Sequence, residues 1–177
     1  MGIEGFLGGI NWSIPSWDLF IGLFFIIAVV LYGLALGRDR ILVILLSIYI
    51  ALAITSNLPF ITERTAEKFG FGTVFVLKIV VFSAAVVFLF FLFSKIGFFS
   101  SFTQTASIFH VGMFSVLHVG LLISIILSFL PETAIETLAS FTRTLFISDL
   151  AKFLWILAPI VAMFLVKKSS GETEIKS

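Results

Sequence analysis

Cysteine is missing from this chain of 177 residues, and charged residues make up only 12% of it. Without cysteine the chain has no disulfides, no thiolate metal ligands and no cysteine nucleophile. The 11 Lys and Arg residues nearly balance the 10 Asp and Glu residues, and they form no basic cluster of the kind that contacts nucleic acid. These absences exclude cysteine enzymes, disulfide frameworks and nucleic-acid-binding proteins.

Apolar side chains are abundant instead. They account for 60% of the residues, and the mean hydropathy is +1.22, whereas soluble domains are about half apolar and about one-quarter charged. A membrane-crossing helix needs about 20 apolar residues, so the chain has room for four or five of them. The composition predicts an integral membrane protein surrounded by the lipid bilayer, folded as one all-α polytopic transmembrane helix bundle over residues 1–168.

Five apolar runs are the predicted membrane spans, at residues 19–36, 41–58, 73–93, 108–130 and 150–166. The last run is short and contains Pro159, which removes one helical hydrogen bond, so a re-entrant segment and a total of four spans are the alternative. Before it, residues 132–147 carry spaced apolar side chains typical of an interfacial amphipathic helix. Residues 169–177 are polar and are predicted to form a disordered tail.

The turn between the first two runs is the most informative segment. Gly33 and Gly37 lie four residues apart, which lets two helix backbones approach closely inside a membrane. Arg38 and Arg40 follow and place the turn at a water boundary, on the cytoplasmic side by the positive-inside rule. We therefore predict that the first two helices pack together as a hairpin, with Asp18 capping the first.

One lysine falls inside a predicted span. Lys78 lies about one and a half turns into the third run, where a charge left in hydrocarbon costs several kcal/mol. Two interpretations stay open: its long stem carries the ammonium to the nearer interface, or the side chain lines a polar conduit.

The fourth run contains a repeated tripeptide, with His110 and Gly112 in one copy and His118 and Gly120 in the other. Eight helical residues rotate by about 800°, so the two imidazoles lie within about 80° of each other around the axis. Several serines share that side, and we count both glycines as helix-packing candidates. Four apolar residues lie opposite and are expected to face lipid, namely Val116, Val119, Ile123 and Leu127.

Three roles are considered for the two histidines: neutral imidazoles bonded to Ser or Thr of a neighbouring helix, a proton relay, or a metal or haem ligand pair. The chain has no third histidine, and no predicted span contains an Asp or Glu to complete a relay. We therefore predict no metal, no cofactor and no catalytic residue, and hence a protein that is not an enzyme.

The opening hairpin resembles the colicin V production protein (CvpA) family. The similarity covers residues 17–55 and rests on Trp17, Asp18, Gly33, Gly37 and the arginines that follow, although Leu36 stands where that family has an arginine. The resemblance implies a small multi-pass protein of the bacterial inner membrane, tied to export or envelope maintenance and lacking a catalytic centre.

Three function classes are weighed, and the third, a membrane enzyme, needs a nucleophile and base or a metal cluster converging at one depth, which the sequence does not show. The first is a non-enzymatic accessory or scaffold protein that works through helix packing, as a homo-oligomer or with another membrane protein, in export or cell-envelope function. The alternative is a subunit of a small-solute or ion channel or transporter, in which Lys78, His110 and His118 line the path.

Overall fold

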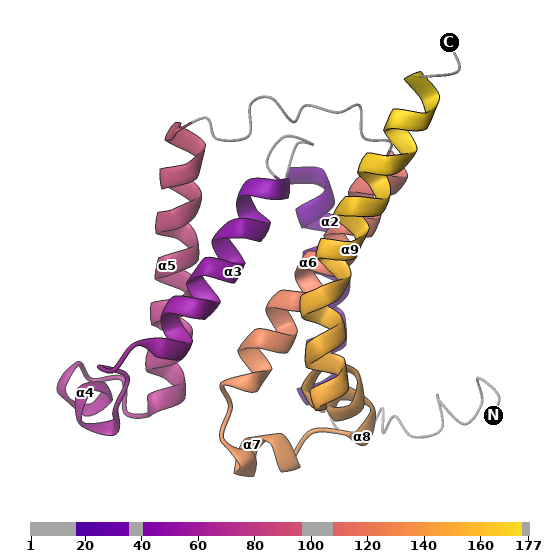
Figure 1. Cartoon of the computed structure of the whole chain (residues 1–177). Coiled ribbons are helices and arrows are strands. Elements are labelled where there is room, and N and C mark those ends of the chain that lie inside the picture. The colour runs from indigo at the N-terminus through magenta and orange to yellow at the C-terminus, as the bar shows by residue number, and fades with distance from the viewer. Residues whose placement is uncertain (1–16, 36–40, 97–107, 175–177) are drawn as a thin grey trace.

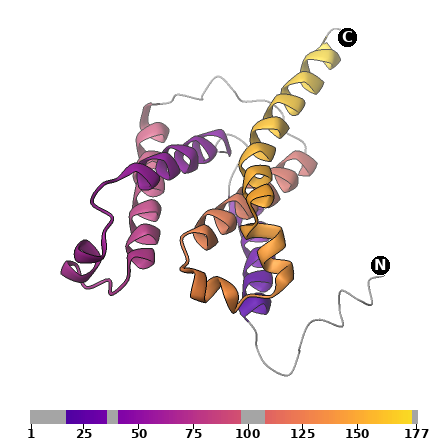
Figure 2. The ribbon, with the colours of Figure 1, turned by 60° about the horizontal axis from the view of Figure 1, so that its bottom comes forward.

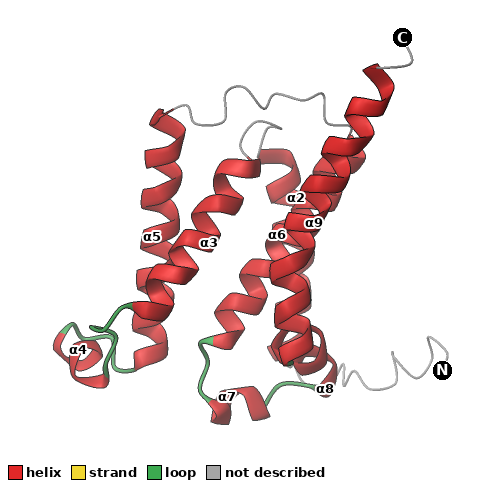
Figure 3. Cartoon of the chain, in the orientation of Figure 1, coloured by secondary structure: helices red, strands yellow, loops and turns green. Residues whose placement is uncertain are grey.

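The computed structural model describes residues 17–35, 41–96 and 108–174. All regular structure in those residues is helical, as Figure 3 shows, and this confirms the predicted all-α class. The helices in chain order are α2 (Trp17–Ala35), α3 (Ile41–Asn57), α4 (Glu63–Lys68), α5 (Val74–Ile96), α6 (Ile108–Ser128), α7 (Glu132–Glu136), α8 (Ser140–Thr142), the π-helical turn η3 (Arg143–Ile147) and α9 (Asp149–Glu174).

The long helices alternate in direction between two ends of the molecule (Figure 1). One end holds the short helices α4, α7 and α8 together with the described loops, and we call it the α4/α7 end. The other end holds the last turns of α2, α5 and α9 and the first turns of α3 and α6. This up-and-down order is the arrangement expected of helices that cross a membrane in sequence.

The helices form two groups, which Figure 2 shows side by side. In the first group α3 packs against α5, and in the second α6 packs against α2 and α9. The predicted hairpin of the first two helices is therefore wrong in its packing, because among the described residues α2 lies along α6 and α3 along α5. The groups meet where Ile48 of α3 and Phe82 of α5 join Leu121 of α6 in one buried cluster.

Helix α6 is the centre of the bundle. In its most apolar stretch 56% of the residues are buried, against 17% for α5, which lies at the edge. Val119, Ile123 and Leu127 are at most 7% exposed and pack against α2 and the η3 region. Of the four residues predicted to face lipid, these three contact protein instead, because neighbours surround α6 on more than one side, and only Val116 is exposed.

By length and composition, two of the described helices can cross a membrane, Val74–Ile96 and Val111–Ser128. A third span is added if the bent pair Ser140–Ile147 and Asp149–Phe164 counts as one. The described parts of the first two long helices, Asp18–Gly33 and Leu42–Asn57, are apolar but shorter. The protein is therefore a helical protein with two or three candidate membrane spans.

The predicted interfacial helix over residues 132–147 is broken into α7, α8 and η3. Thr137 Oγ1 donates to the carbonyl of Ala134 at 2.7 Å just after α7 ends, and Ala139 is extended, with φ −60° and ψ 150°. Such local side-chain bonds compete with helix continuation. The segment after Ala139 instead joins α9 through a 47° bend at Ser148, whose hydroxyl accepts the amide of Ala151.

Helix α9 is longer than the sequence predicts. It contains Pro159 and continues through Glu174, so most of the predicted disordered tail at 169–177 is helical. Extending an existing helix fixes one residue per hydrogen bond, which costs far less than starting a new one. Only residues 175–177 of that tail lie outside the described residues.

Candidate functional site

Small and polar residues are buried on two faces of α6. Ser115 and His118 face α2, whereas Gly120 and Ser124 face α9 and η3. At 100° per residue the two pairs lie about 120–180° apart around the helix axis. We call these four residues the α6 seam, and the neighbours of each show what it does.

At Ser115 the seam meets α2. The Ser115 hydroxyl donates to the carbonyl of Val111 in its own helix at 2.8 Å, and a Cβ built on Gly33 would lie 3.2 Å from that hydroxyl. Gly33 is therefore a point of close approach, but to α6 and not to α3. Its predicted companion Gly37 lies outside the described residues, as do Arg38 and Arg40.

His118 is fully buried between aromatic rings. Its Nδ1 lies 2.7 Å from the carbonyl oxygen of Phe114, and because a carbonyl only accepts, Nδ1 carries the proton. The imidazole stacks on Tyr32 of α2 with ring centres 5.5 Å apart, and the edge of Phe114 approaches it at 6.1 Å. Its Nδ1 thus bonds to the backbone of its own helix, where the sequence predicts a Ser or Thr of a neighbour. His110 lies in the first turn of α6, and its side chain is outside the described part.

Gly120 receives the indole of Trp155 from α9. A Cβ at Gly120 would overlap the Trp155 ring, so only glycine fits there. Trp155 Nε1 donates to the carbonyl of Leu145 at 2.8 Å, and its ring stacks on Phe146 with a centroid distance of 5.7 Å. From the other side, Ser124 Oγ donates to the carbonyl of Phe146 at 2.6 Å. Two carbonyls of the π-helical turn are therefore held by donors from α6 and α9.

The remaining sequence candidates lie apart from the seam. A Cβ built on Gly112 has no described atom within 4 Å, so no close approach occurs there. The Lys78 ammonium lies 6.0 Å from the ring centre of Phe129, a cation–π contact one turn inside α5. Phe129 follows His118 by eleven residues, or about 16 Å of helix, so Lys78 and His118 are not brought together.

Trp155 and Ser124 are the residues that sequence reasoning misses. The repeated glycine at position 120 signals a close approach, but nothing in the sequence says that an aromatic ring 35 positions later fills the space. Ser124 is one of the serines on or beside the histidine side of the predicted helix, but its partner is a backbone carbonyl, which carries no residue-specific signal.

The contacts of the seam join α6 to its neighbours, and both seam hydroxyls donate to backbone carbonyls. Among the described residues no three His, Asp or Glu side chains converge to hold a metal ion. No family model, curated protein or solved structure matches the chain.

Proposed function

We propose that the protein is a five-span integral membrane protein that acts as a non-enzymatic accessory or scaffold subunit. The five spans are α2, α3, α5, α6 and the bent segment from α8 to α9. At 1.5 Å per residue, the 19 residues of α2 and 17 of α3 extend about 28 and 26 Å. Local bilayer thinning accommodates helices a few ångströms short of the hydrocarbon thickness.

One observation carries this proposal: Ser124 and Trp155 donate hydrogen bonds that join α6 and α9 to the π-helical turn, while the edge helix α5 presents an apolar face outward. Trp155 and Ser124 hold the π-helical turn. By contrast, Val87, Phe88 and Phe91 of α5 are more than half exposed. A membrane protein with rigid internal contacts and a broad apolar flank is suited to hold another membrane helix, either from a second copy or from a different protein.

The location and process are part of the same proposal. The resemblance over residues 17–55 points to the bacterial inner membrane and to export or envelope maintenance. Lys95, in the last turn of α5, lies at the end of the molecule opposite the α4/α7 end. The end with Lys95 is the cytoplasmic one if the turn with Arg38 and Arg40 follows the positive-inside rule.

Single-cysteine cross-linking in native membranes tests the partner. The chain contains no cysteine, so Phe88→Cys places one reactive thiol on the outward face of α5. We expect this variant to form one discrete cross-linked product and to co-purify with a partner in a complex of defined mass. The matched control is Phe24→Cys on α2, where Phe24 is 61% exposed against 67% for Phe88. Equal, diffuse or absent products from both positions contradict the proposal.

Reconstitution separates a scaffold from a channel or transporter subunit. Purified protein in liposomes is expected to produce no solute flux above that of empty liposomes. Flux that disappears on replacing Lys78 or His118, in variants that remain folded, would overturn the scaffold role and establish the alternative.

A further inference from the structure

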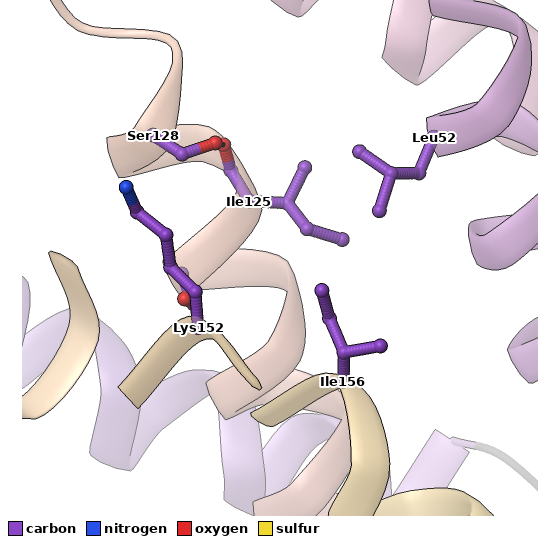
Figure 4. Close-up of a pocket in the computed structure, with 6 residues that line it drawn as sticks. Leu52, Ile125, Ser128, Lys152 and Ile156 are labelled. Atoms are coloured by element: carbon purple, nitrogen blue, oxygen red, sulfur yellow. Dashed lines mark hydrogen bonds between the residues drawn. The ribbon is translucent and has the colours of Figure 1, made fainter. Parts of the chain in front are cut away.

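A small cavity lies where the two helix groups meet, near the α4/α7 end. Its volume is about 80 Å³, and α3, α6 and α9 each contribute to its wall. Figure 4 shows the side chains of Leu52, Ile125 and Ile156 turned toward one shared space, with the Lys152 ammonium on the Ser128 side. The cavity is therefore apolar on one side and cationic on the other.

Lys152 is the one lining group with protons to offer an anion. Ser124 and Ser128 already donate their hydroxyl protons to the carbonyls of Phe146 and Ile125. Lys152 Nζ lies 3.7 Å from a carboxylate oxygen of Asp149, its sole ion pair among the described residues, and Asp149 is fully exposed. An exposed pair of this length is weak, so the ammonium stays available to a stronger anionic partner.

The depth of Lys152 fits a lipid headgroup. It lies in the first turn of α9, at the α4/α7 end, and Figure 4 shows its ammonium beside Ser128, the last residue of α6. Ile156, one helical turn deeper, closes the apolar side, and its carbonyl accepts a hydrogen bond from Tyr49 of α3 at 2.5 Å. A phosphate at Lys152 would thus have its hydrocarbon directed between α3 and α9.

We propose that this cavity is a binding site for an anionic phospholipid, with the phosphate paired to Lys152 and the first part of one acyl chain against Leu52, Ile125 and Ile156. A volume of about 80 Å³ equals the share of two or three water molecules, so a whole lipid is excluded and only a short stretch of chain enters. The inference rests on the membrane placement proposed above, but it does not require the scaffold role.

Lipid retention by the purified full-length protein tests the site. Delipidated protein in detergent is mixed with phosphatidylglycerol or phosphatidylcholine, and bound lipid is counted by native mass spectrometry. We expect phosphatidylglycerol to bind more tightly than phosphatidylcholine. Lys152→Gln should weaken phosphatidylglycerol binding about fivefold, which is the contribution of one lysine near an anionic surface.

Two further variants test the role of the charge. Lys152→Arg should retain the affinity for phosphatidylglycerol, and Asp149→Asn should raise that affinity because the competing carboxylate is removed. Unfolding midpoints establish that each variant is folded.

Matched variants distinguish this site from general charge attraction. Lys78→Gln removes a cation near the same end but outside the cavity and should leave phosphatidylglycerol binding unchanged. Leu52→Phe fills the apolar side and should weaken binding without altering charge. Equal binding of the two lipids, equal losses from Lys78→Gln and Lys152→Gln, or displacement of lipid by inorganic phosphate would overturn the proposal. None of these results would affect the cross-linking of α5, so the two proposals fail separately.

Discussion

The carboxylate of Asp18, in the first turn of α2, accepts a hydrogen bond from the backbone amide of Ala139, 121 residues later in the chain. Both oxygens lie within reach, at 2.9 and 3.0 Å. Ala139 is the residue before α8 and has no side-chain oxygen of its own to cap that helix. The sequence predicts that Asp18 caps its own helix; in the structure its carboxylate binds the start of the α8 segment and connects α2 to it.

Replacing Asp18 should therefore loosen the connection between α2 and the α8 segment. Asp18→Ala is expected to lower the free energy of unfolding by about 1 kcal/mol, because the Ala139 amide loses a charged acceptor. Asp18→Asn should lose less, since its amide oxygen still accepts. Denaturant unfolding in detergent measures the effect. Glu136→Ala is the control, because this exposed acid at the end of α7 makes no side-chain hydrogen bond to another described residue. Equal losses of stability from Asp18→Ala and Glu136→Ala would contradict the proposed connection between α2 and the α8 segment.

Alanine at Gly120 and at Gly112 should have opposite consequences. A Cβ at Gly120 overlaps the Trp155 ring, so Gly120→Ala forces α9 away from α6 and is expected to cost about 1–3 kcal/mol of stability. Gly112→Ala enters open space in the same helix and should leave stability unchanged or raise it by up to about 1 kcal/mol. Adding Trp155→Leu to Gly120→Ala should recover part of the loss. Thermal unfolding midpoints of the four proteins check this, and a neutral Gly120→Ala would contradict the packing.

The bond from Ser124 to the Phe146 carbonyl should matter more than a serine bond within one helix. Ser124→Ala leaves a buried carbonyl of η3 without this donor, which costs about 1 kcal/mol. Ser47→Ala is the matched control: Ser47 is equally buried, but its hydroxyl donates to Val43 of its own helix at 2.7 Å. We expect faster amide exchange around η3 in Ser124→Ala alone. The same exchange rates in both variants would mean that the bond does not hold the turn.

The helices themselves could be predicted from the sequence, because the apolar runs are bounded by charge and proline. The run 41–58 ends before Pro59 and corresponds to Ile41–Asn57, and the run 108–130 ends before Pro131 and corresponds to Ile108–Ser128. The helices are apolar on all sides, so the sequence does not indicate which face of each helix packs against another helix. A run that is apolar all round specifies no partner, so nothing indicates that α2 lies along α6.

The breaks near the last helix escape prediction for a different reason. The end of α7 and the bend before α9 depend on hydroxyl-to-backbone bonds of Thr137 and Ser148. Ser and Thr occur in continuous helices as well as at helix ends, so residue type alone does not locate a break. The sequence indicates one part of the seam, because Gly120 predicts a close approach of two helices. It does not indicate the partner Trp155, because that contact depends on how α9 packs against α6.

Gly33 and Gly22 give a final comparison within α2. A Cβ on Gly33 would lie 3.2 Å from Ser115 Oγ, whereas one on Gly22 has no described atom within 4 Å. A leucine at Gly33 cannot fit without separating α2 from α6, which would also disturb the stacking of Tyr32 on His118 in the adjacent turn. Gly33→Leu is therefore expected to lower stability by about 2–3 kcal/mol, in the range for overpacking, and Gly22→Leu to leave it unchanged or higher. Membrane insertion should be normal for both, because each substitution adds an apolar side chain. Unfolding in detergent gives the stability difference, and carbonate extraction gives the insertion. A loss of partner cross-linking at unchanged stability in Gly33→Leu would show instead that this glycine contacts another chain.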